Sequence, residues 1–431
     1  MPVRDMDFAA PPMTARIVDR RTPDPTVDPV CAFYTTYPYP APVDNLDRAR
    51  TEWQDPNRDR AEYHLYWPEM PYRADLDVLI AGCGTWQAAK YALCRPAAHV
   101  VGIDISQTSL EHTERLQQKY GLTNLDLCQL PVEQADTLER RFDLIICTGV
   151  LHHLADPDTG LRALRTALKP RGAILLMVYG RYGRTGIYML QDYCRRLGVG
   201  TSHREMTDLM EVLEALPSLH PAVSLLRHAR DSRNAHTLAD ALLNPRDQSY
   251  SVPQFFHFVE RNGLTLARWR LQAPYLPQCG AMSTTQHADR LIALPKREQY
   301  AAMELWRGTM AQHSAVVVRR ETSVFRGTLS FDNERWREYV PLRFPSTVCV
   351  TERLPPAAAA VLLNRGHLYH DLVLVVGSEE RQMVDAIDGQ RTIADIADLT
   401  GGPETRPRAR KFFEKLWRYD QVVFDASKAG L

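Results

Sequence analysis

Asp77-Val78-Leu79-Ile80-Ala81-Gly82-Cys83-Gly84 is the stretch that decides the fold of this chain. Its apolar part, residues 78–81, is typical of a short buried strand. The two glycines that follow let the chain turn sharply and bring backbone N–H groups close to a ligand. The sequence therefore predicts a strand that ends in a binding turn.

A second apolar run, residues 99–103, ends at Asp104. A carboxylate about twenty residues after the glycine turn of a strand-helix-strand unit can accept hydrogen bonds from both hydroxyls of a ribose. A dinucleotide fingerprint would need a glycine where Gln87 stands, so binding of NAD or FAD is disfavoured.

Further strands and helices alternate along the chain. Residues 124–130, 142–147 and 173–179 are predicted strands, and Leu161, Leu164 and Leu168 share one face of a helix between the last two. Such alternation indicates an α/β fold with a parallel sheet covered on both faces. The runs at 264–271 and 315–318 are predicted to close the sheet as an antiparallel hairpin.

The turn at residues 82–84, Asp104, the strand that begins Phe142-Asp143 and the sequence Leu151-His152-His153-Leu154 together resemble the class I S-adenosylmethionine-dependent methyltransferases, in particular their quinone-biosynthesis and small-molecule branch. The chain departs from that pattern at Trp86, where a third glycine is usual. The resemblance implies a seven-stranded, mostly parallel, Rossmann-like sheet with helical insertions.

The same resemblance implies a cofactor, S-adenosyl-L-methionine, with S-adenosyl-L-homocysteine as product and no metal. Gly82, Cys83 and Gly84 would face its methionine part, and Asp104 its ribose. The remaining cofactor contacts that it implies are Ile105 on the adenine face, Glu133 at the adenine amino group, and Thr148 and Gly149 on the methyl side.

Methyl transfer from a sulfonium mainly needs alignment and exclusion of water. If the acceptor is a hydroxyl or phenol, His152, just past the fourth strand, is the best placed residue to remove its proton. A packing role for His152 explains its position equally well. The pair of histidines lacks a carboxylate or a third histidine at ligand spacing, so no metal site is expected.

The segments around the catalytic sheet supply the candidates for substrate binding. Residues 1–29 are predicted to be a flexible lead, and residues 30–70 a lid or cap in which Tyr37 faces the substrate. The alternative is that the tyrosines of this segment only pack on the core. The loop after the fifth strand, residues 180–186, is rich in glycine and adds Arg181, Tyr182 and Arg184. Either arginine could hold a carboxylate or phosphate through two hydrogen bonds, and a solvated turn is the alternative.

The chain is predicted to contain two domains. The methyltransferase domain spans residues 71–320, with insertions at 187–243 and 273–312 that enclose the acceptor. A linker at 321–344 leads to residues 345–431, which resemble peptide-binding winged helices of ribosomal-peptide biosynthesis and the tail domain of some protein lysine methyltransferases. An extra structural or dimerising domain is the simpler alternative.

Composition limits the partners and the compartment. Lysine plus arginine equals aspartate plus glutamate at 52 each, so the overall charge gives no nucleic-acid or membrane signal. The eight cysteines form no Cys-x-x-Cys pair, which suits a reducing compartment. With no apolar signal core or membrane-spanning run recognised, a cytoplasmic protein is expected.

Three functions follow from the sequence. The first is methylation of oxygen or nitrogen on a small-molecule acceptor. The second is methylation of a peptide or protein docked through the C-terminal domain. The third is a non-catalytic binding protein that kept the fold while Trp86 blocks the turn. The sequence decides neither the acceptor nor the oligomeric state, and a homodimer is one arrangement that it allows.

Overall fold

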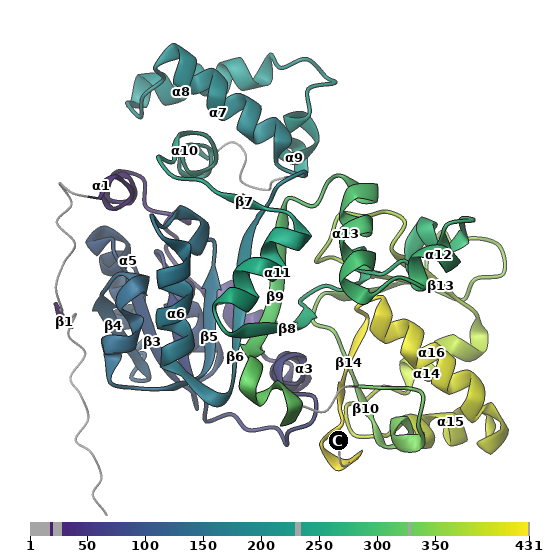
Figure 1. Cartoon of the computed structure of the whole chain (residues 1–431). Helices are drawn as coiled ribbons and strands as arrows, with labels where there is room; N and C mark the ends of the chain where they lie inside the picture. Colours follow the sequence, from purple (N-terminus) through teal and green to yellow (C-terminus); the bar gives the residue numbers. More distant parts are fainter. Residues whose placement is uncertain (1–17, 20–27, 229–233, 326–328, 430–431) are drawn as a thin grey trace, which may run out of the picture.

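The computed structural model of the chain describes residues 18–19, 28–228, 234–325 and 329–429. Its centre is a mostly parallel sheet (Figure 1). The strands of this sheet are β1 (Val18–Asp19), β2 (Asp77–Ala81), β3 (His99–Asp104), β4 (Leu125–Gln129), β5 (Phe142–Thr148), β6 (Leu168–Gly180), β7 (Ser249–Tyr250), β8 (Leu264–Trp269) and β9 (Gln312–Arg319). They lie in the order β1-β4-β3-β2-β5-β6-β9-β8, with β7 beside β6.

The predicted Rossmann-like α/β sheet is confirmed, and its seven expected strands are all present. β9 runs antiparallel to both β6 and β8, as the predicted closing hairpin requires. The described residues add β1 and β7, two residues each, to the seven. Segments this short carry no periodic signal, so the sequence could not reveal them.

Helices cover both faces of the sheet and explain why β2 is apolar throughout. Leu79 and Ala81 pack into the core shared with α6 (Pro157–Ala167) and α11 (Val252–Arg261). Val78 and Ile80 point the opposite way, into the core shared with α3 (Pro56–Tyr66), α4 (Gln87–Cys94) and α5 (Gln107–Tyr120). Successive strand residues face opposite sides, so a strand buried on both faces must be continuously apolar.

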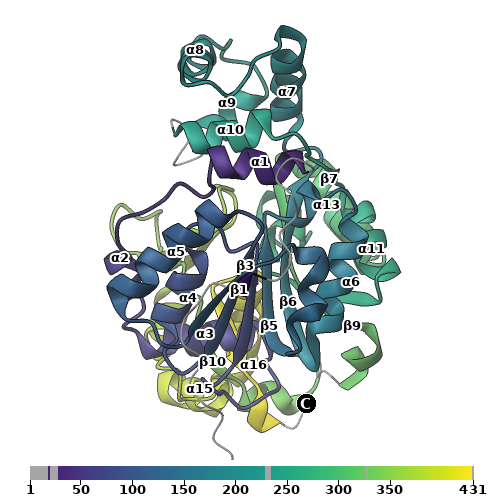
Figure 2. The same cartoon turned by 90° about the vertical axis from the view of Figure 1, so that its left-hand side faces the viewer.

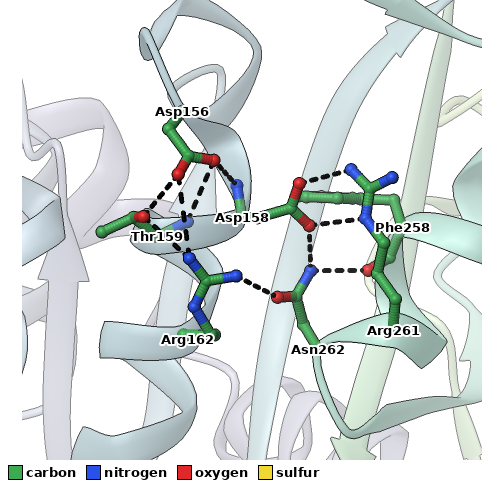
Figure 3. Close-up of polar contacts among 7 residues, drawn as sticks. All are labelled: Asp156, Asp158, Thr159, Arg162, Phe258, Arg261 and Asn262. Carbon is green, nitrogen blue, oxygen red and sulfur yellow. Dashed lines mark hydrogen bonds and ion pairs between the residues drawn. The ribbon is translucent and has the colours of Figure 1, made fainter.

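A network of side chains joins the start of α6 to the end of α11 (Figure 3). Asp156 caps α6 by accepting the backbone N–H groups of Asp158 and Thr159. Asp158 in turn accepts from Arg261 Nε at 2.6 Å and from Asn262 Nδ2 at 2.5 Å. A cap of this kind satisfies donors that the first helical turn leaves free, and here it also fixes two helices on one face.

The first predicted insertion forms a helical cap above the carboxyl ends of the strands (Figures 1 and 2). It contains α7 (Thr185–Leu197), α8 (His203–Glu214), α9 (Ala222–His228) and α10 (Ala235–Leu243). These helices have their own apolar core, which Phe33 of α1 (Pro29–Thr36) joins. The helical cap and α1 therefore pack as one layer over the sheet edge.

The second predicted insertion, residues 273–312, lies beside β8. It contains η3 (Ala273–Tyr275), η4 (Gly280–Thr284), α12 (Ala288–Ile292) and α13 (Lys296–Arg307). α13 packs against η3 and α11, on the side of the C-terminal unit rather than above the strand ends. Of the two insertions, the first is the one placed over the carboxyl edge.

The C-terminal unit contains two small antiparallel sheets and three helices. One sheet pairs β11 (Thr347–Val350), β12 (Ala360–Asn364) and β13 (Val373–Val376), and the other pairs β10 (Val340–Arg343) with β14 (Val422–Asp425). The helices, at about the predicted positions, are α14 (Ser378–Asp385), α15 (Ile393–Gly401) and α16 (Arg406–Arg418).

The stretch predicted as a linker belongs in part to the C-terminal unit. The stretch 321–344, predicted as a linker, contains η5 (Arg320–Phe325) in part, η6 (Glu334–Glu338) and the whole of β10, so pairing within the C-terminal unit begins inside it. Pro341 interrupts the strand signal of β10. The predicted flexible lead, 1–29, falls outside the described residues except at 18–19 and 28–29.

The C-terminal unit meets the central sheet in two places, near the amino ends of the strands and at β8, where Arg268 lies 3.3 Å from Asp420. Ala426 N donates to Pro68 O at 2.8 Å, and the neighbouring Trp67 donates through Nε1 to Arg171 O near the start of β6 at 2.9 Å. Within the described part of the chain, no helix is both long and apolar enough to cross a membrane.

Candidate active site at the carboxyl edge of the sheet

The turn after β2 requires glycine at two positions. Gly82 and Gly84 have φ angles of +71° and +55°. A Cβ on Gly82 would lie 2.4 Å from a methyl carbon of Val150, and one on Gly84 would lie 2.5 Å from Tyr39 O. Cys83, fully buried between them, donates its N–H to Ile103 O at 2.9 Å. The turn therefore packs directly against β3 and against residues 39–40, which are distant in the sequence.

Asp104 ends β3 directly beside this turn. Its carboxylate accepts the N–H of Gly84 at 2.8 Å and that of Ser106 at 2.9 Å, one on each oxygen. Burial raises the pKa of this carboxyl group, and the two N–H groups oppose that rise. Each oxygen keeps a further lone pair, so the carboxylate can still accept ligand hydroxyls.

Ile105 and Gln129 extend the site from Asp104 toward β4. Gln129 stands opposite Asp104 in the strand register and donates through Nε2 to Ile105 O at 3.1 Å. Gln129 was not singled out from the sequence, because only the parallel register brings it to Asp104. Glu133 lies farther along, in η1 (Val132–Leu138), where burial raises the pKa of its carboxyl group.

The end of β5 forms the other wall of the turn. Thr148 Oγ1 accepts from Gln87 Nε2 at 3.3 Å. Gly149, with φ of +80°, donates its N–H to Met177 O at 3.4 Å. The predicted cofactor residues of β2, β3 and β5 therefore meet at one carboxyl edge.

Part of the predicted lid covers this edge. Thr85 Oγ1 donates to Pro40 O at 2.7 Å, Ser106 Oγ donates to Tyr34 O at 3.2 Å, and Cys31 Sγ lies 3.6 Å from Ile105 O. Tyr37 points elsewhere, because its hydroxyl donates to Thr201 O in the helical cap. Within 30–70, α1 and residues 37–40 reach the turn, whereas α2 (Asp47–Glu52) packs on α4 and α3 packs on the sheet.

Trp86 does not need to be glycine in this fold. Its φ of −158° is negative and so lies outside the left-handed region that favours glycine, and Trp86 is the residue before α4. Its ring packs against the core shared with α3, α4 and α5, with the Lys90 ammonium 5.5 Å from the ring centroid. The tryptophan is therefore accommodated on a helix-covered face of the sheet.

His152 lies in η2 (Leu151–His153) at the end of β5 and is fully buried. Its ring centroid is 3.9 Å from that of Tyr179, and neither ring nitrogen has a hydrogen-bond partner among the described residues. Burial, helped by His153 and Arg184, holds its pKa well below 6.5. The adjacent His153 differs, because its Nδ1 contacts Arg246 O at 2.5 Å.

The three candidate residues of the glycine-rich loop differ in burial. Arg181 and Tyr182 are exposed. Arg184 is buried, lies with Cζ 3.5 Å from the centroid of the Tyr179 ring, and forms an ion pair with Asp247 at 3.1 Å. The structure therefore brings Arg184, but neither of the other two, into the cluster around His152.

A cavity of about 300 Å³ lies at the opposite edge of the sheet. Trp67, Arg73, Asp143 and Lys169 line it, and Asp143 pairs with both cations. This cavity is remote from the glycine turn. In the described ranges, no group of three or more histidine, cysteine, aspartate or glutamate side chains could hold a metal ion.

Known proteins resemble this chain in sequence and in fold. A family model described as a methyltransferase domain matches residues 79–174. The chain is 30% identical over 292 residues to an uncharacterised protein of Synechococcus sp., a match that covers 66% of this chain and 69% of that protein.

Shorter matches point to methyltransferases of known name. A ubiquinone biosynthesis O-methyltransferase of Alkalilimnicola ehrlichii is 28% identical over 157 residues, which is 34% of this chain and 63% of that enzyme. A tRNA U34 carboxymethyltransferase of Desulfotalea psychrophila is 28% identical over 150 residues, 35% of this chain and 44% of that enzyme. The chain thus matches less than two thirds of either enzyme.

Among solved structures, PKMT2 from Rickettsia typhi in complex with AdoHcy has a similar fold. The TM-score is 0.60 at 15% identity, and the match covers 86% of this chain and 76% of that chain. At this identity the likeness concerns the fold alone, and its coverage reaches beyond the catalytic sheet.

Proposed function

Because this chain belongs to the class I S-adenosylmethionine-dependent methyltransferase superfamily, we propose that it methylates an oxygen or nitrogen atom of a small-molecule acceptor. The single observation that carries this choice of acceptor is His152, buried beneath the helical cap with both ring nitrogens free of partners in the described structure.

The residues at the carboxyl edge fit the cofactor of the superfamily. The turn at Gly82 and Gly84 leaves no room for a Cβ, and Asp104 ends the neighbouring strand with spare lone pairs. We assign Gly82, Cys83 and Gly84 to the methionine part, Asp104 to the ribose and Ile105 to the adenine face. S-adenosylmethionine supplies an activated methyl group on sulfur, which an acceptor oxygen or nitrogen takes with release of S-adenosylhomocysteine.

The protein's part in the reaction is to align the acceptor, exclude water and accept a proton. Thr148 and Gly149 line the methyl side. His152 follows them, and its lowered pKa leaves it as neutral imidazole at pH 7, the form that can take a proton. Either ring nitrogen could receive the hydroxyl proton, because neither is engaged by a described residue.

A peptide or protein acceptor remains the second candidate, favoured by the fold shared with PKMT2 over 86% of this chain. The contacts of the C-terminal unit weigh against docking through it. The one at Pro68 is near the amino ends of the strands, opposite the edge that holds Asp104 and His152, and the ion pair of Asp420 with Arg268 is on the outer strand β8.

Isotope transfer separates these acceptors. The full chain is incubated with methyl-labelled S-adenosylmethionine and an extract of the source cells, and the label is then counted in the small-molecule and macromolecular fractions. We expect the label among the small molecules. Label confined to protein would replace this proposal with the second candidate.

A further inference from the structure

Buried polar atoms without partners gather on the acceptor side of the site. Among the residues that the structure describes, they include both ring nitrogens of His152, Nε of Arg184, Oδ1 of Asp247 and the hydroxyl of Tyr188. Nearly all buried polar atoms in folded proteins are hydrogen-bonded, so such a group in one place indicates a ligand that satisfies them.

These atoms belong to one neighbourhood. Tyr179 contacts both ends of it, with the His152 ring 3.9 Å away between centroids and Arg184 Cζ 3.5 Å from its centroid. A backbone hydrogen bond also holds Asp247 near His152. Gln248, the residue after Asp247, donates its N–H to His152 O at 3.0 Å.

The charge of Arg184 is already matched. One guanidinium nitrogen lies 3.1 Å from Asp247 Oδ2, and Gln191 Nε2 donates to the same oxygen at 2.8 Å. A second buried carboxylate, Asp240, accepts the Tyr179 hydroxyl at 3.2 Å and the Tyr34 hydroxyl at 2.7 Å. No surplus positive charge is left among these groups to hold an acid.

We propose that Arg184 and Asp247 form an anchoring subsite for a hydroxyl group of an acceptor that carries no net charge. The inference rests on the proposed small-molecule function and names its substrate class. It replaces the expectation that Arg184 holds a carboxylate or phosphate.

The reason is that one donor, Arg184 Nε, and one acceptor, Asp247 Oδ1, both lack partners in the described structure, beside the Tyr188 hydroxyl, which can both donate and accept. A hydroxyl accepts from Arg184 Nε–H and donates to Asp247 Oδ1, and so satisfies both atoms. A carboxylate or phosphate dianion has only acceptor atoms and would add negative charge next to two carboxylates. An ammonium group has only donors and would place them against a guanidinium.

Separation by charge tests the inference. A small-molecule extract of the source cells is divided on ion exchangers into anionic, neutral and cationic fractions, and each is incubated with the full chain and methyl-labelled S-adenosylmethionine. We expect most label in the neutral fraction. Label mainly in the anionic or the cationic fraction would overturn the subsite while leaving the methyltransferase function intact. No label in any of the three would refute the small-molecule function, and the subsite with it.

The variant Asp247→Asn tests the residue itself. Its side chain keeps its shape but loses the charge and one acceptor, so we expect the KM for the neutral acceptor fraction to rise about tenfold while kcat changes little. Asp192→Asn, on the exposed side of α7, is the matched control and should leave KM unchanged. A folded Asp247→Asn protein with wild-type KM would overturn the subsite; if that variant does not fold, the charge separation decides alone.

Discussion

Gly84 is a glycine for two separable reasons. Its φ of +55° is costly for any residue with a side chain, and a Cβ would also meet Tyr39 O at 2.5 Å. Gly121 has a similar φ of +61°, but no described atom lies within 4 Å of where its Cβ would be. The two positions therefore share the backbone cost and differ in the contact.

The variants Gly84→Ala and Gly121→Ala should consequently behave differently. Both should lose about 1 kcal/mol of unfolding free energy or somewhat more, measured in urea, because alanine is strained at these angles. Only Gly84→Ala should also bind S-adenosylhomocysteine at least about tenfold more weakly by calorimetry, since it displaces the segment that covers the turn. Equal affinity in both variants would show that the contact with Tyr39 is irrelevant to cofactor binding.

His152 gives a prediction about pH. Burial, His153 and Arg184 hold its pKa well below 6.5, so the imidazole stays neutral as the pH falls from 7 to 6.5 and gains a proton only below that. The acid limb of the kcat profile, measured with the active acceptor fraction, should therefore lie below pH 6.5.

The substitution His152→Gln should lower kcat by about a hundredfold, the usual worth of a general base, and leave the affinity for S-adenosylhomocysteine unchanged. His153→Gln is the control, because the Nδ1 of His153 contacts Arg246 O. If His152→Gln keeps the wild-type rate, the histidine is a packing residue.

At the scale of elements, α1 is joined to the helical cap through one buried carboxylate. Tyr34 of α1 donates to Asp240 Oδ1 of α10 at 2.7 Å, while Ser106, at the carboxyl edge of the sheet, donates to Tyr34 O. Removing the Tyr34 hydroxyl leaves Asp240 Oδ1 with only the longer hydrogen bond from Asn244 Nδ2, at 3.4 Å, among the described residues, and so loosens the segment over the turn.

We therefore expect Tyr34→Phe to speed dissociation of S-adenosylhomocysteine about fivefold to tenfold in stopped-flow measurements, with a fold as compact as that of the wild type. Thr36→Val, on the same helix, is the control, because its hydroxyl bonds only to Ala32 O within α1 in the described structure. Dissociation that is equally fast in both variants would mean that any change in α1 acts this way.

Elements with a strong local pattern could be predicted from the sequence, and contacts between distant segments could not. β2 could be recognised from four consecutive apolar residues, which the structure buries, and from the two glycines that follow. β10 could not be predicted because Pro341 interrupts its strand pattern. Its pairing partner, β14, follows much later in the chain. The ion pair of Arg184 with Asp247 could not be predicted for the same reason. Asp247 is distant in the sequence and lies beside Arg184 because the chain returns from the helical cap to pair with β6.

For the whole molecule, the order of strands and helices carried enough information to predict the sheet and the edge at which the candidate site lies. A residue type alone does not show its backbone angle, and at Trp86 the negative φ and the packing of the ring on a helix-covered face remove the reason to expect a blocked turn. The packing of the C-terminal unit on the catalytic sheet has no local signal, because it depends on side chains hundreds of positions apart.

The contact between the C-terminal unit and α3 includes an ionisable carboxyl group. Asp425 of β14 lies 3.4 Å from His64 Nε2 and 3.4 Å from Arg60 Nη2, both on α3. Burial would raise the pKa of this carboxyl group, but hydrogen bonds from His64 and Ser427 and the His64 charge hold it below its usual value of 3.8. A lowered folded-state pKa stabilises the fold above the unfolded value and loses that contribution as the pH falls through the folded one.

Asp425→Asn should therefore cost about 2 kcal/mol of unfolding free energy at pH 7. The cost should shrink as the pH falls below about 4, because Asp425 of the unfolded wild-type chain takes up a proton there, whereas the folded carboxylate does so only at lower pH. Asp385→Asn, an exposed partner of Arg381, should change stability little at either pH. Because Asp425 acts at the amino ends of the strands, its loss should leave the affinity for S-adenosylhomocysteine unchanged while the protein is folded. A parallel loss of cofactor affinity would instead mean that the C-terminal unit and the carboxyl edge are coupled across the sheet, and the case against a role for that unit in catalysis would fail.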